Sequence, residues 1–296
     1  MRFRKYHGAG NDFVMLTDLG GSLGPPGALP RDLVAALCDR HTGVGADGVI
    51  RVLRPDSYRM DYYNADGGEA EMCGNGIRCL VLHEQDAGRL DDADLIVQTR
   101  AGPVMVRPAG VARYTVDMGA PRLQKEDVPM KGSGSSLRAE VNLDGETLVG
   151  SGVSMGNPHF VLFTDEIGRA LDDDLIHGLG SRLEVHPDFP AKTNVEFVEI
   201  VNATRVRMRV WERGIGETLA CGSGICAIAV VSASLERTGP HLWVEMPGGE
   251  LEVEWEPGGH VWLTGPAEHV FEGEIDRAWL EARGLTEHAD LVGEAI

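Results

Sequence analysis

Lysine is scarce in this chain of 296 residues, and positive charge as a whole is outnumbered. Lysine and arginine together number 27 against 46 aspartates and glutamates, which gives a formal net charge of −19. Because contact with phosphate groups needs clustered basic side chains, this balance argues against binding to nucleic acid or to an anionic membrane surface. A pyridoxal phosphate cofactor would need a Schiff-base lysine, and none of the four has a suggestive setting: Lys5, Lys125, Lys131 and Lys192.

Long apolar runs are also missing. The N-terminal stretch MRFRKYHGAGNDF is charged and lacks the apolar region of a secretory signal, and no later run approaches the roughly 18 apolar residues of a membrane helix. We therefore expect a cytoplasmic protein without a signal peptide or a membrane partner. In that compartment the five cysteines are expected to be thiols rather than a disulfide framework: Cys38, Cys73, Cys79, Cys221 and Cys226.

The most informative feature that is present is a repeated block. The stretch ACGSGICA echoes MCGNGIRC, and the leading cysteines of the two stretches are 148 residues apart, half the length of the chain. With that offset, residues 60–77 and 208–225 match at seven of eighteen positions without a gap, and GNDF at 10–13 is echoed by GNPHF at 156–160. Internal duplication into two similar α/β domains is the simplest interpretation. Two copies related by a pseudo-twofold axis would place equivalent residues face to face across a cleft.

The remaining pattern indicates strands with few helices. Alternating apolar residues predict a hairpin around HGAGN, strands over VIRVLR and YRMDYYNA, and a similar series of strands in the second half. The polar and then Gly/Ser-rich residues 124–136 are the best candidate for a linker. The tail from Asp276 has an amphipathic helical pattern to which no chemistry attaches. Further helices are expected over four ranges: 32–41, 73–87, about 167–183 and 221–239.

Each repeated cysteine lies at a turn just before a helix. Unpaired backbone N–H groups and the helix dipole favour negative charge there, so we expect the thiol pKa of Cys73 and Cys221 to be lowered from about 8.5. The glycines that follow allow backbone N–H groups to approach a ligand closely, and a carboxylate would be held well between two helix N-termini. Such a pair suits proton abstraction on one side of a carboxylate-bearing carbon and proton donation on the other. The result would be inversion of a stereocentre without a cofactor.

The cysteines also admit simpler roles. Cys38, Cys79 and Cys226 are expected to be small apolar fillers of the core. The spacings C-x5-C and C-x4-C do not match the usual zinc knuckle, so we expect no metal site. A disulfide between Cys73 and Cys221 would be an oxidised, inactive form in the cytoplasm. The glycine turns lack the lysine and the full glycine pattern of phosphate-binding loops.

Five blocks together resemble the diaminopimelate epimerase family: HGAGNDF, YNADGGEAEMCGNGIRC, SMGNPHF, TNVEF and WERGIGETLACGSGICA. The resemblance runs from the first residue to about residue 275. It implies an α/β (α+β) fold with two pseudo-symmetric domains, each a mixed barrel-like β-sheet around a central helix. The domains would comprise residues 1–117 with 267–296, and residues 118–266. The apolar run ICAIAVV after Gly224 agrees with a helix enclosed by such a sheet.

The resemblance also implies an activity, the interconversion of LL- and meso-diaminopimelate on the route to lysine and peptidoglycan, without a cofactor or a metal. Cys73 and Cys221 would be the acid/base pair, with His159 and Glu212 each assisting one thiol. The family further implies a homodimer. The distal end of the substrate would be bound by Asn64, Asn194 and Arg213. The reacting end would be held by another group of side chains and backbone N–H groups: Asn11, Gly74, Asn75, Asn157, Gly222 and Ser223.

Residue chemistry supports these roles independently. Arg213 suits a fixed carboxylate, Glu212 suits an ammonium or a neighbouring thiol, and asparagines read a zwitterion without adding charge. His159 as a satisfied strand histidine, and Glu212 with Arg213 as a surface pair, are the alternatives. Two other functions are open: a racemase for a short substrate such as proline or histidine, which would not need the distal residues, and an amino-acid-binding protein, which would not need matched thiols. One departure from the family is Gly48, where some relatives have Gln.

Overall fold

The computed structural model describes residues 1–54 and 56–288, and the chain divides into two compact units. The first unit joins Met1–Val116 to the chain from Gly265 onward, and the second unit is Asp117–Thr264. The expected domains met at 117/118 and 266/267, so the unit boundaries lie one or two residues earlier in the chain. We call the two units the first half and the second half.

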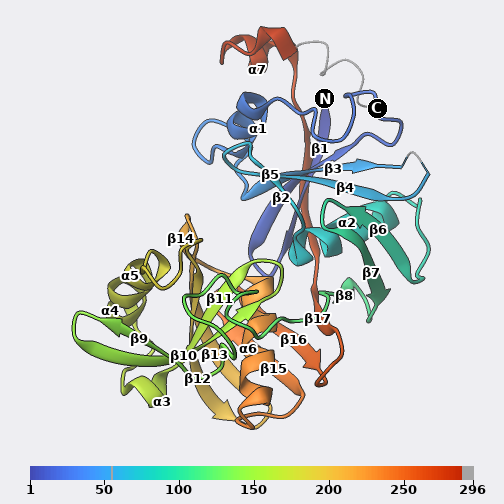
Figure 1. The fold of residues 1–296 in the computed structure, drawn as a ribbon. Coiled ribbons are helices and arrows are strands. Elements are labelled where there is room, and N and C mark those ends of the chain that lie inside the picture. The colour runs from blue at the N-terminus through green and yellow to red at the C-terminus, as the bar shows by residue number, and fades with distance from the viewer. Residues whose placement is uncertain (55, 289–296) are drawn as a thin grey trace. The chain divides into compact units, whose positions relative to one another are not determined.

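The first half is built of short strands with helices between them (Figure 1). Positive φ angles at Ala9 and Gly10 turn the chain from the first strand into the second, which confirms the predicted hairpin. The strands are β1 (Arg2–Gly8), β2 (Asn11–Thr17), β3 (Gly48–Leu53), β4 (Arg59–Asn64), β5 (Glu69–Ala70), β6 (Leu95–Thr99), β7 (Gly102–Pro108), β8 (Arg113–Asp117) and β18 (Glu268–Glu274). The helices are α1 (Arg31–Cys38), α2 (Gly74–Asp86) and α7 (Arg277–Glu281), followed by the 3-10 turn η2 (Thr286–His288).

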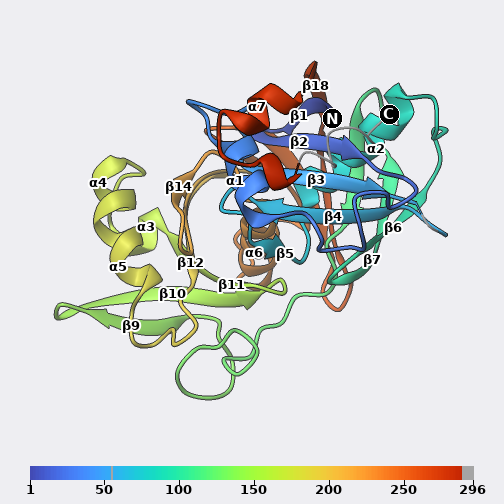
Figure 2. The ribbon, with the colours of Figure 1, turned by 90° about the horizontal axis from the view of Figure 1, so that it is seen from above.

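The second half has the same character, and Figure 2 shows its extended β9–β10 pair most clearly. The predicted helix over 221–239 is five residues too long, because the chain leaves the helix at Glu236, whose φ angle is +56°. The strands are β9 (Ala139–Leu143), β10 (Glu146–Ser154), β11 (Pro158–Phe163), β12 (Asn194–Asn202), β13 (Arg205–Glu212), β14 (Gly216–Thr218), β15 (His241–Met246), β16 (Gly249–Trp255) and β17 (Val261–Pro266). The helical segments are α3 (Thr164–Ile167), α4 (Asp173–Leu175), the π-helical turn η1 (Ile176–Gly180), α5 (Ser181–Glu184) and α6 (Gly222–Ser234).

The strands of the two halves pair in the same order, which confirms the predicted duplication. In the first half β1–β2 is antiparallel, β2–β3 parallel, β3–β4 antiparallel, β4–β6 parallel, and β6–β7 antiparallel. In the second half β10–β11, β11–β12, β12–β13, β13–β15 and β15–β16 repeat these directions in turn. The register repeats as well, since Phe13 pairs with Gly48 as His159 pairs with Asn194, an offset of 146 residues in both strands.

One helix packs into the strands of each half. Helix α2 contacts β1, β2, β3 and β18, and α6 contacts β10, β11, β12, β15 and β16. Every residue of α6 from Gly224 to Ser232 is buried, as predicted for a helix that is apolar on all sides. Complete burial of a Val or Ile side chain contributes about 1.5–3 kcal/mol. This packing therefore fixes each helix firmly in its own half, together with the cysteine that precedes it.

The predicted linker at residues 124–136 is wrong. The segment lies within the second half, and Val128 and Met130 are buried in the core of that half. Its backbone is hydrogen-bonded to itself, with the N–H of Lys125 on the Gly134 carbonyl and the N–H of Met130 on the Lys125 carbonyl, each at 2.8 Å. Val128 and Met130, in the middle of the polar stretch, pack into the core and hold the segment there. The polar average composition of the segment hides these two residues.

The helix predicted from Asp276 is short. The Asp276 carboxylate caps α7 by accepting the N–H of Trp279 at 2.8 Å, and Leu280 is buried. The tail continues through the turn η2, and its last residues, 289–296, lie outside the described residues. Over residues 1–54 and 56–288, none of the helices combines the length and the apolar character needed to cross a membrane.

Candidate active site

Cys73 lies in extended backbone directly before α2 and is the N-cap of that helix. Its Sγ accepts the N–H of Gly76 at 3.5 Å, and Gly74 and Asn75 form the first turn. The first N–H groups of a helix have no partner inside it, so the thiol supplies one of them with an acceptor. Cys73 is partly exposed. The lowered pKa expected for the Cys73 thiol stays a prediction.

Two asparagines predicted to bind substrate lie beside the Cys73 thiol. Asn11 Oδ1 is 3.7 Å from Cys73 Sγ and accepts Nδ2–H of Asn75 at 3.2 Å. Asn11 donates from Nδ2 to Asp47 Oδ2 at 2.7 Å. Asn75 Oδ1 accepts from Arg78 at 2.9 Å. Asp47 and Arg78 therefore hold the two carboxamides in place, and neither is singled out by the sequence pattern.

Asn64, predicted to bind the distal end of the substrate, is the exposed last residue of β4. Among the described residues of the first half, it stands outside the hydrogen-bonded set around Cys73. Its register partner in β3 is Gly48. A Cβ atom at Gly48 would come within 2.5 Å of the Tyr63 carbonyl oxygen and 2.6 Å of the Tyr62 ring. Only glycine fits at position 48 while these two tyrosines keep their places.

Cys221 holds the equivalent place before α6, where Gly222 and Ser223 form the first turn. It is buried, and its Sγ lies 3.6 Å from Ser223 Oγ. Burial raises the pKa of the Cys221 thiol well above its ordinary value, and the carboxylates of Glu212 and Glu196 raise it further. The expected lowering of the pKa is therefore wrong for this cysteine. Desolvation and two neighbouring carboxylates outweigh the helix N-terminus.

Glu212, predicted to assist a thiol, is the last residue of β13. Its Oε1 accepts a hydrogen bond from Thr218 Oγ1. Burial raises the pKa of the Glu212 carboxyl, while hydrogen bonds with Thr218 and Cys221 act in the opposite direction. The carboxyl thus turns toward Thr218 and Cys221 instead of forming a surface pair with Arg213.

His159, also predicted to assist a thiol, is fully buried on β11. Its Nδ1 lies 2.6 Å from Glu196 Oε1, and its Nε2 lies 3.0 Å from Asn157 Oδ1. Asn157 in turn donates from Nδ2 to Ser223 Oγ at 3.2 Å. These bonds link three predicted residues, His159, Asn157 and Ser223, to the Cys221 thiol. Glu196 is missing from the predicted residues, although a single charge inside the buried strand NVEFV is a signal that could have found it.

Asn194 and Arg213, predicted to bind the distal end, are neighbours where β12 begins and β13 ends. Asn194 is buried, donates from Nδ2 to the Pro158 carbonyl at 2.9 Å, and accepts the backbone N–H of Arg213 at 2.8 Å. The Arg213 guanidinium reaches the Ala191 carbonyl at 3.2 Å and is exposed. Asn194 therefore holds the chain at Arg213, and the guanidinium is open to an anion.

The cysteines expected to fill the core are buried. Cys38, Cys79 and Cys226 are all free thiols without surface access. Burial raises the pKa of Cys38 to about 12 and raises that of Cys79 as well. A thiol that stays protonated at neutral pH is a poor nucleophile and a poor base, so Cys38 and Cys79 suit a packing role. Cys226 is 0% exposed within α6, which suits the same role.

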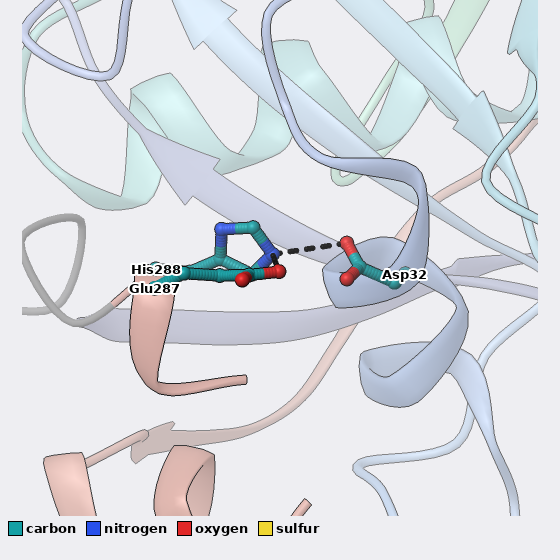
Figure 3. A group of neighbouring side chains, drawn as sticks. All are labelled: Asp32, Glu287 and His288. Carbon is teal, nitrogen blue, oxygen red and sulfur yellow. Dashed lines mark hydrogen bonds and ion pairs between the residues drawn. The ribbon is translucent and has the colours of Figure 1, made fainter. Parts of the chain in front are cut away.

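One further group carries side chains of the kind that bind metals. Asp32 on α1, together with Glu287 and His288, has ligand atoms within 4.8 Å of one another (Figure 3). His288 Nε2 lies 3.0 Å from Asp32 Oδ1, and Asp32 and Glu287 are exposed. The group contains no predicted site residue. We interpret it as a surface contact between the end of the described chain and α1.

Comparison with known proteins agrees with this arrangement. A family model for diaminopimelate epimerase matches residues 3–124 and 151–270. The diaminopimelate epimerase of Moorella thermoacetica is 45% identical over 283 residues, which cover 93% of this chain and 99% of that protein. The enzyme of the same name from Desulforudis audaxviator is 46% identical over 286 residues, 94% of this chain and 100% of that protein.

Solved structures share the fold at lower identity. A hydroxyproline epimerase from Agrobacterium vitis has a TM-score of 0.68 at 16% identity, covering 92% of this chain and 91% of its own. A phenazine biosynthesis protein of the PhzF family from Bacillus anthracis has a TM-score of 0.63 at 17% identity, covering 93% and 98%. Because the family model spans both repeated halves and the curated relatives align over nearly their full length, this chain belongs to the diaminopimelate epimerase family.

Proposed function

We propose that the chain interconverts LL-2,6-diaminopimelate and meso-diaminopimelate by a two-cysteine acid/base mechanism, without a cofactor or a metal. The observation that carries this proposal is the repeated thiol at a helix N-terminus with a carboxamide nearby. Cys73 faces Asn11, and Cys221 is linked to Asn157 through Ser223. The product would serve the synthesis of lysine and of peptidoglycan precursors.

The proton balance assigns different starting states to the two thiols. One cysteine, as thiolate, takes the proton from the α-carbon, and the other, as thiol, delivers a proton to the opposite side of that carbon. The raised pKa of Cys221 favours the thiol form, so Cys221 is the donor in the resting enzyme. Cys73, whose Sγ accepts the Gly76 N–H, is then the base. After one turnover the two protonation states are exchanged, and the reverse reaction restores them.

The remaining predicted residues divide by what they offer a zwitterionic substrate. Backbone N–H groups at the N-termini of α2 and α6, from Gly74, Asn75, Gly222 and Ser223, suit the carboxylate of the reacting end. Asn11 and Asn157 add side-chain donors and acceptors there. The distal amino-acid end would meet Asn64, Asn194 and Arg213. The exposed guanidinium of Arg213 supports this assignment, since a short substrate such as proline has no second carboxylate for it.

Proton NMR in D2O tests the proposal directly. Reduced enzyme with LL-diaminopimelate should give the meso isomer with deuterium at the inverted α-carbon. Exchange with proline or histidine but not with diaminopimelate would keep the two-thiol chemistry and overturn the substrate. No exchange with any of the three would overturn the reaction itself.

The family resemblance also supports two further proposals, a homodimer and a cytoplasmic location. Light scattering coupled to gel filtration would measure the mass in solution. A mass near 32 kDa, that of one chain, would contradict the homodimer. Fractionation of the source cells would measure the second.

A further inference from the structure

The chain of hydrogen bonds behind Cys221 begins at a residue with no predicted role. Glu196 Oε1 lies 2.6 Å from Nδ1 of His159, and both side chains are fully buried. Asn157 donates from Nδ2 to Ser223, so its Oδ1 is left to accept Nε2–H of His159. The ring orientation of His159 is thus set by Glu196 on one side and Asn157 on the other.

The first half shows that the fold does not need a histidine and a glutamate at the positions of His159 and Glu196. In the first half Phe13 pairs with Gly48 and Met15 with Ile50, while in the second half His159 pairs with Asn194 and Val161 with Glu196. The antiparallel register fixes which residues correspond. Val49 pairs with Tyr63 and Val195 pairs with Trp211, and Tyr63 and Trp211 are equivalent in the 148-residue repeat, so these strands match with an offset of 146 positions. Phe13 and Ile50 therefore hold the places of His159 and Glu196, and both are buried apolar residues.

The contacts with the following helix repeat in the same way. A Cβ atom added at Gly76 in α2 would meet Cδ1 of Ile50 at 2.6 Å, and one added at Gly224 in α6 would meet Oε1 of Glu196 at 2.8 Å and Sγ of Cys221 at 3.3 Å. The Glu196 carboxylate and the Cys221 thiol thus lie against the same glycine. An apolar side chain fills the matching space in the first half.

The bonding of Glu196 is also unusual for a structural carboxylate. Its Oε2 is buried and has no hydrogen-bond partner among residues 1–54 and 56–288. Buried carboxylates that serve only the fold have their oxygens satisfied, since an unpaired oxygen costs free energy. The side-chain partner that Glu196 does have is His159. The burial of Glu196 is therefore explained by its role in orienting the His159 ring.

We propose that Glu196 is a positioning residue for the epimerisation: it fixes the His159 imidazole against Asn157 and so keeps the chain from His159 to Ser223 in contact with the Cys221 thiol. The inference rests on the proposed function for the role of Cys221. The titratable groups near Cys221 in the second half come from three strands, His159 on β11, Glu196 on β12 and Glu212 on β13. Glu212 raises the thiol pKa more than Glu196 does.

The first arm of the test is steady-state kinetics with LL-diaminopimelate. Glu196→Ala should lower kcat by about 10- to 100-fold with little change in KM, the size typical of losing a partner that orients a reacting group. Glu196→Gln should recover part of that loss, because its amide group can still form a hydrogen bond with Nδ1 of His159. Glu199→Gln makes the same change on the same strand, where the side chain pairs with Arg207, and should leave kcat unchanged.

The second arm measures the pH dependence of Cys221 alkylation by iodoacetamide, followed by mass spectrometry of its peptide. Removing the Glu196 charge removes one source of the raised thiol pKa, so alkylation should begin at lower pH in Glu196→Gln than in the wild type or in Glu199→Gln. An unchanged pH profile together with an unchanged kcat in Glu196→Gln would overturn the proposal, even if Glu196→Ala does not fold.

The two arms separate this inference from the proposed function. Wild-type enzyme that fails to epimerise diaminopimelate contradicts the function. The alkylation arm needs no substrate and still reports whether Glu196 is coupled to Cys221.

Discussion

The two halves place the same thiol on the same scaffold and surround it with different side chains. In the first half, Asp47 holds Asn11 beside Cys73, and the strand positions below the helix carry Phe13 and Ile50. In the second half, the equivalent strand positions carry His159 and Glu196, and the equivalent asparagine reaches Cys221 through Ser223. The backbone is duplicated, but the environment of the thiol is not.

This difference has a chemical reason. Two thiols in identical surroundings would have equal pKa values, and neither would be preferred as base or as acid. Cys73 is partly exposed and accepts a backbone N–H, whereas Cys221 is buried beside two carboxylates that raise its pKa. In the proposed mechanism one thiol gives a proton to the substrate and the other takes one from it in each turnover, so unequal surroundings would define which of them is protonated at rest. Duplication thus supplied the geometry, and the side chains that differ between the halves supply the chemistry.

The largest effect is expected when either thiol is removed. Cys73→Ala and Cys221→Ala should each lower kcat by about 1,000-fold or more in both directions, because each removes one of the two proton carriers. The NMR exchange assay measures this. Cys38→Ala, at a buried cysteine on α1, is the control and should keep its activity. Full activity in either variant at 73 or 221 would remove the two-base mechanism.

The second effect comes from giving the second half the apolar pair of the first. The double variant His159→Phe with Glu196→Ile should lose about 100-fold or more in kcat, since the chain leading to Ser223 is gone. Its free energy of unfolding should stay equal or rise by about 1–4 kcal/mol, because replacing a buried ionisable pair by apolar side chains is often neutral or stabilising.

Urea unfolding and the exchange assay together measure that variant. A folded double variant with wild-type kcat would contradict the claim that the side chains around Cys221 serve the reaction, since the His–Glu pair would then be unnecessary. A fall in stability of several kcal/mol would show that the pair supports the fold of the second half.

The third effect comes from placing a residue of the second half at the equivalent strand position of the first half. Gly48 in the first half corresponds to Asn194 in the second. Gly48→Asn should destabilise the protein by about 1–3 kcal/mol, the usual cost of overpacking, because a Cβ there meets the Tyr63 carbonyl oxygen at 2.5 Å. Gly20→Asn is the matched control, since nothing lies within 4 Å of a Cβ at Gly20. Equal urea midpoints for the two variants would contradict the steric argument.

The smallest effect is expected at a feature that the second half lacks. Asp32 and His288 join the end of the described chain to α1 at the surface. Asp32→Asn should change the free energy of unfolding by less than about 1 kcal/mol, since exposed pairs of this kind contribute little, and should leave kcat unchanged. A loss of activity in this variant would point to a role for the tail that its surface position does not indicate.

Much of the fold follows from local sequence patterns. The hairpin at HGAGN and the helices after Cys73 and Cys221 rest on turn residues and apolar spacing, which act within a few positions of the chain. The linker expected at 124–136 failed because Val128 and Met130 find partners far away in sequence. The end of α6 was placed too late for a related reason, since the left-handed exit at Glu236 is a backbone conformation that the side chain does not announce.

The repeated cysteine block by itself determined the duplication, because a motif of that length rarely occurs twice in one chain by chance. Five sequence blocks together determined the family, and the repeat selected Cys73 and Cys221 as the two candidate thiols. Tertiary structure alone decided the state of Cys221 and the place of Glu196. A pKa depends on burial and on charges brought near by distant strands, and Glu196 lies 25 residues from Cys221 in the chain. The helix N-terminus visible in the sequence predicts a lowered pKa, and packing in three dimensions reverses it.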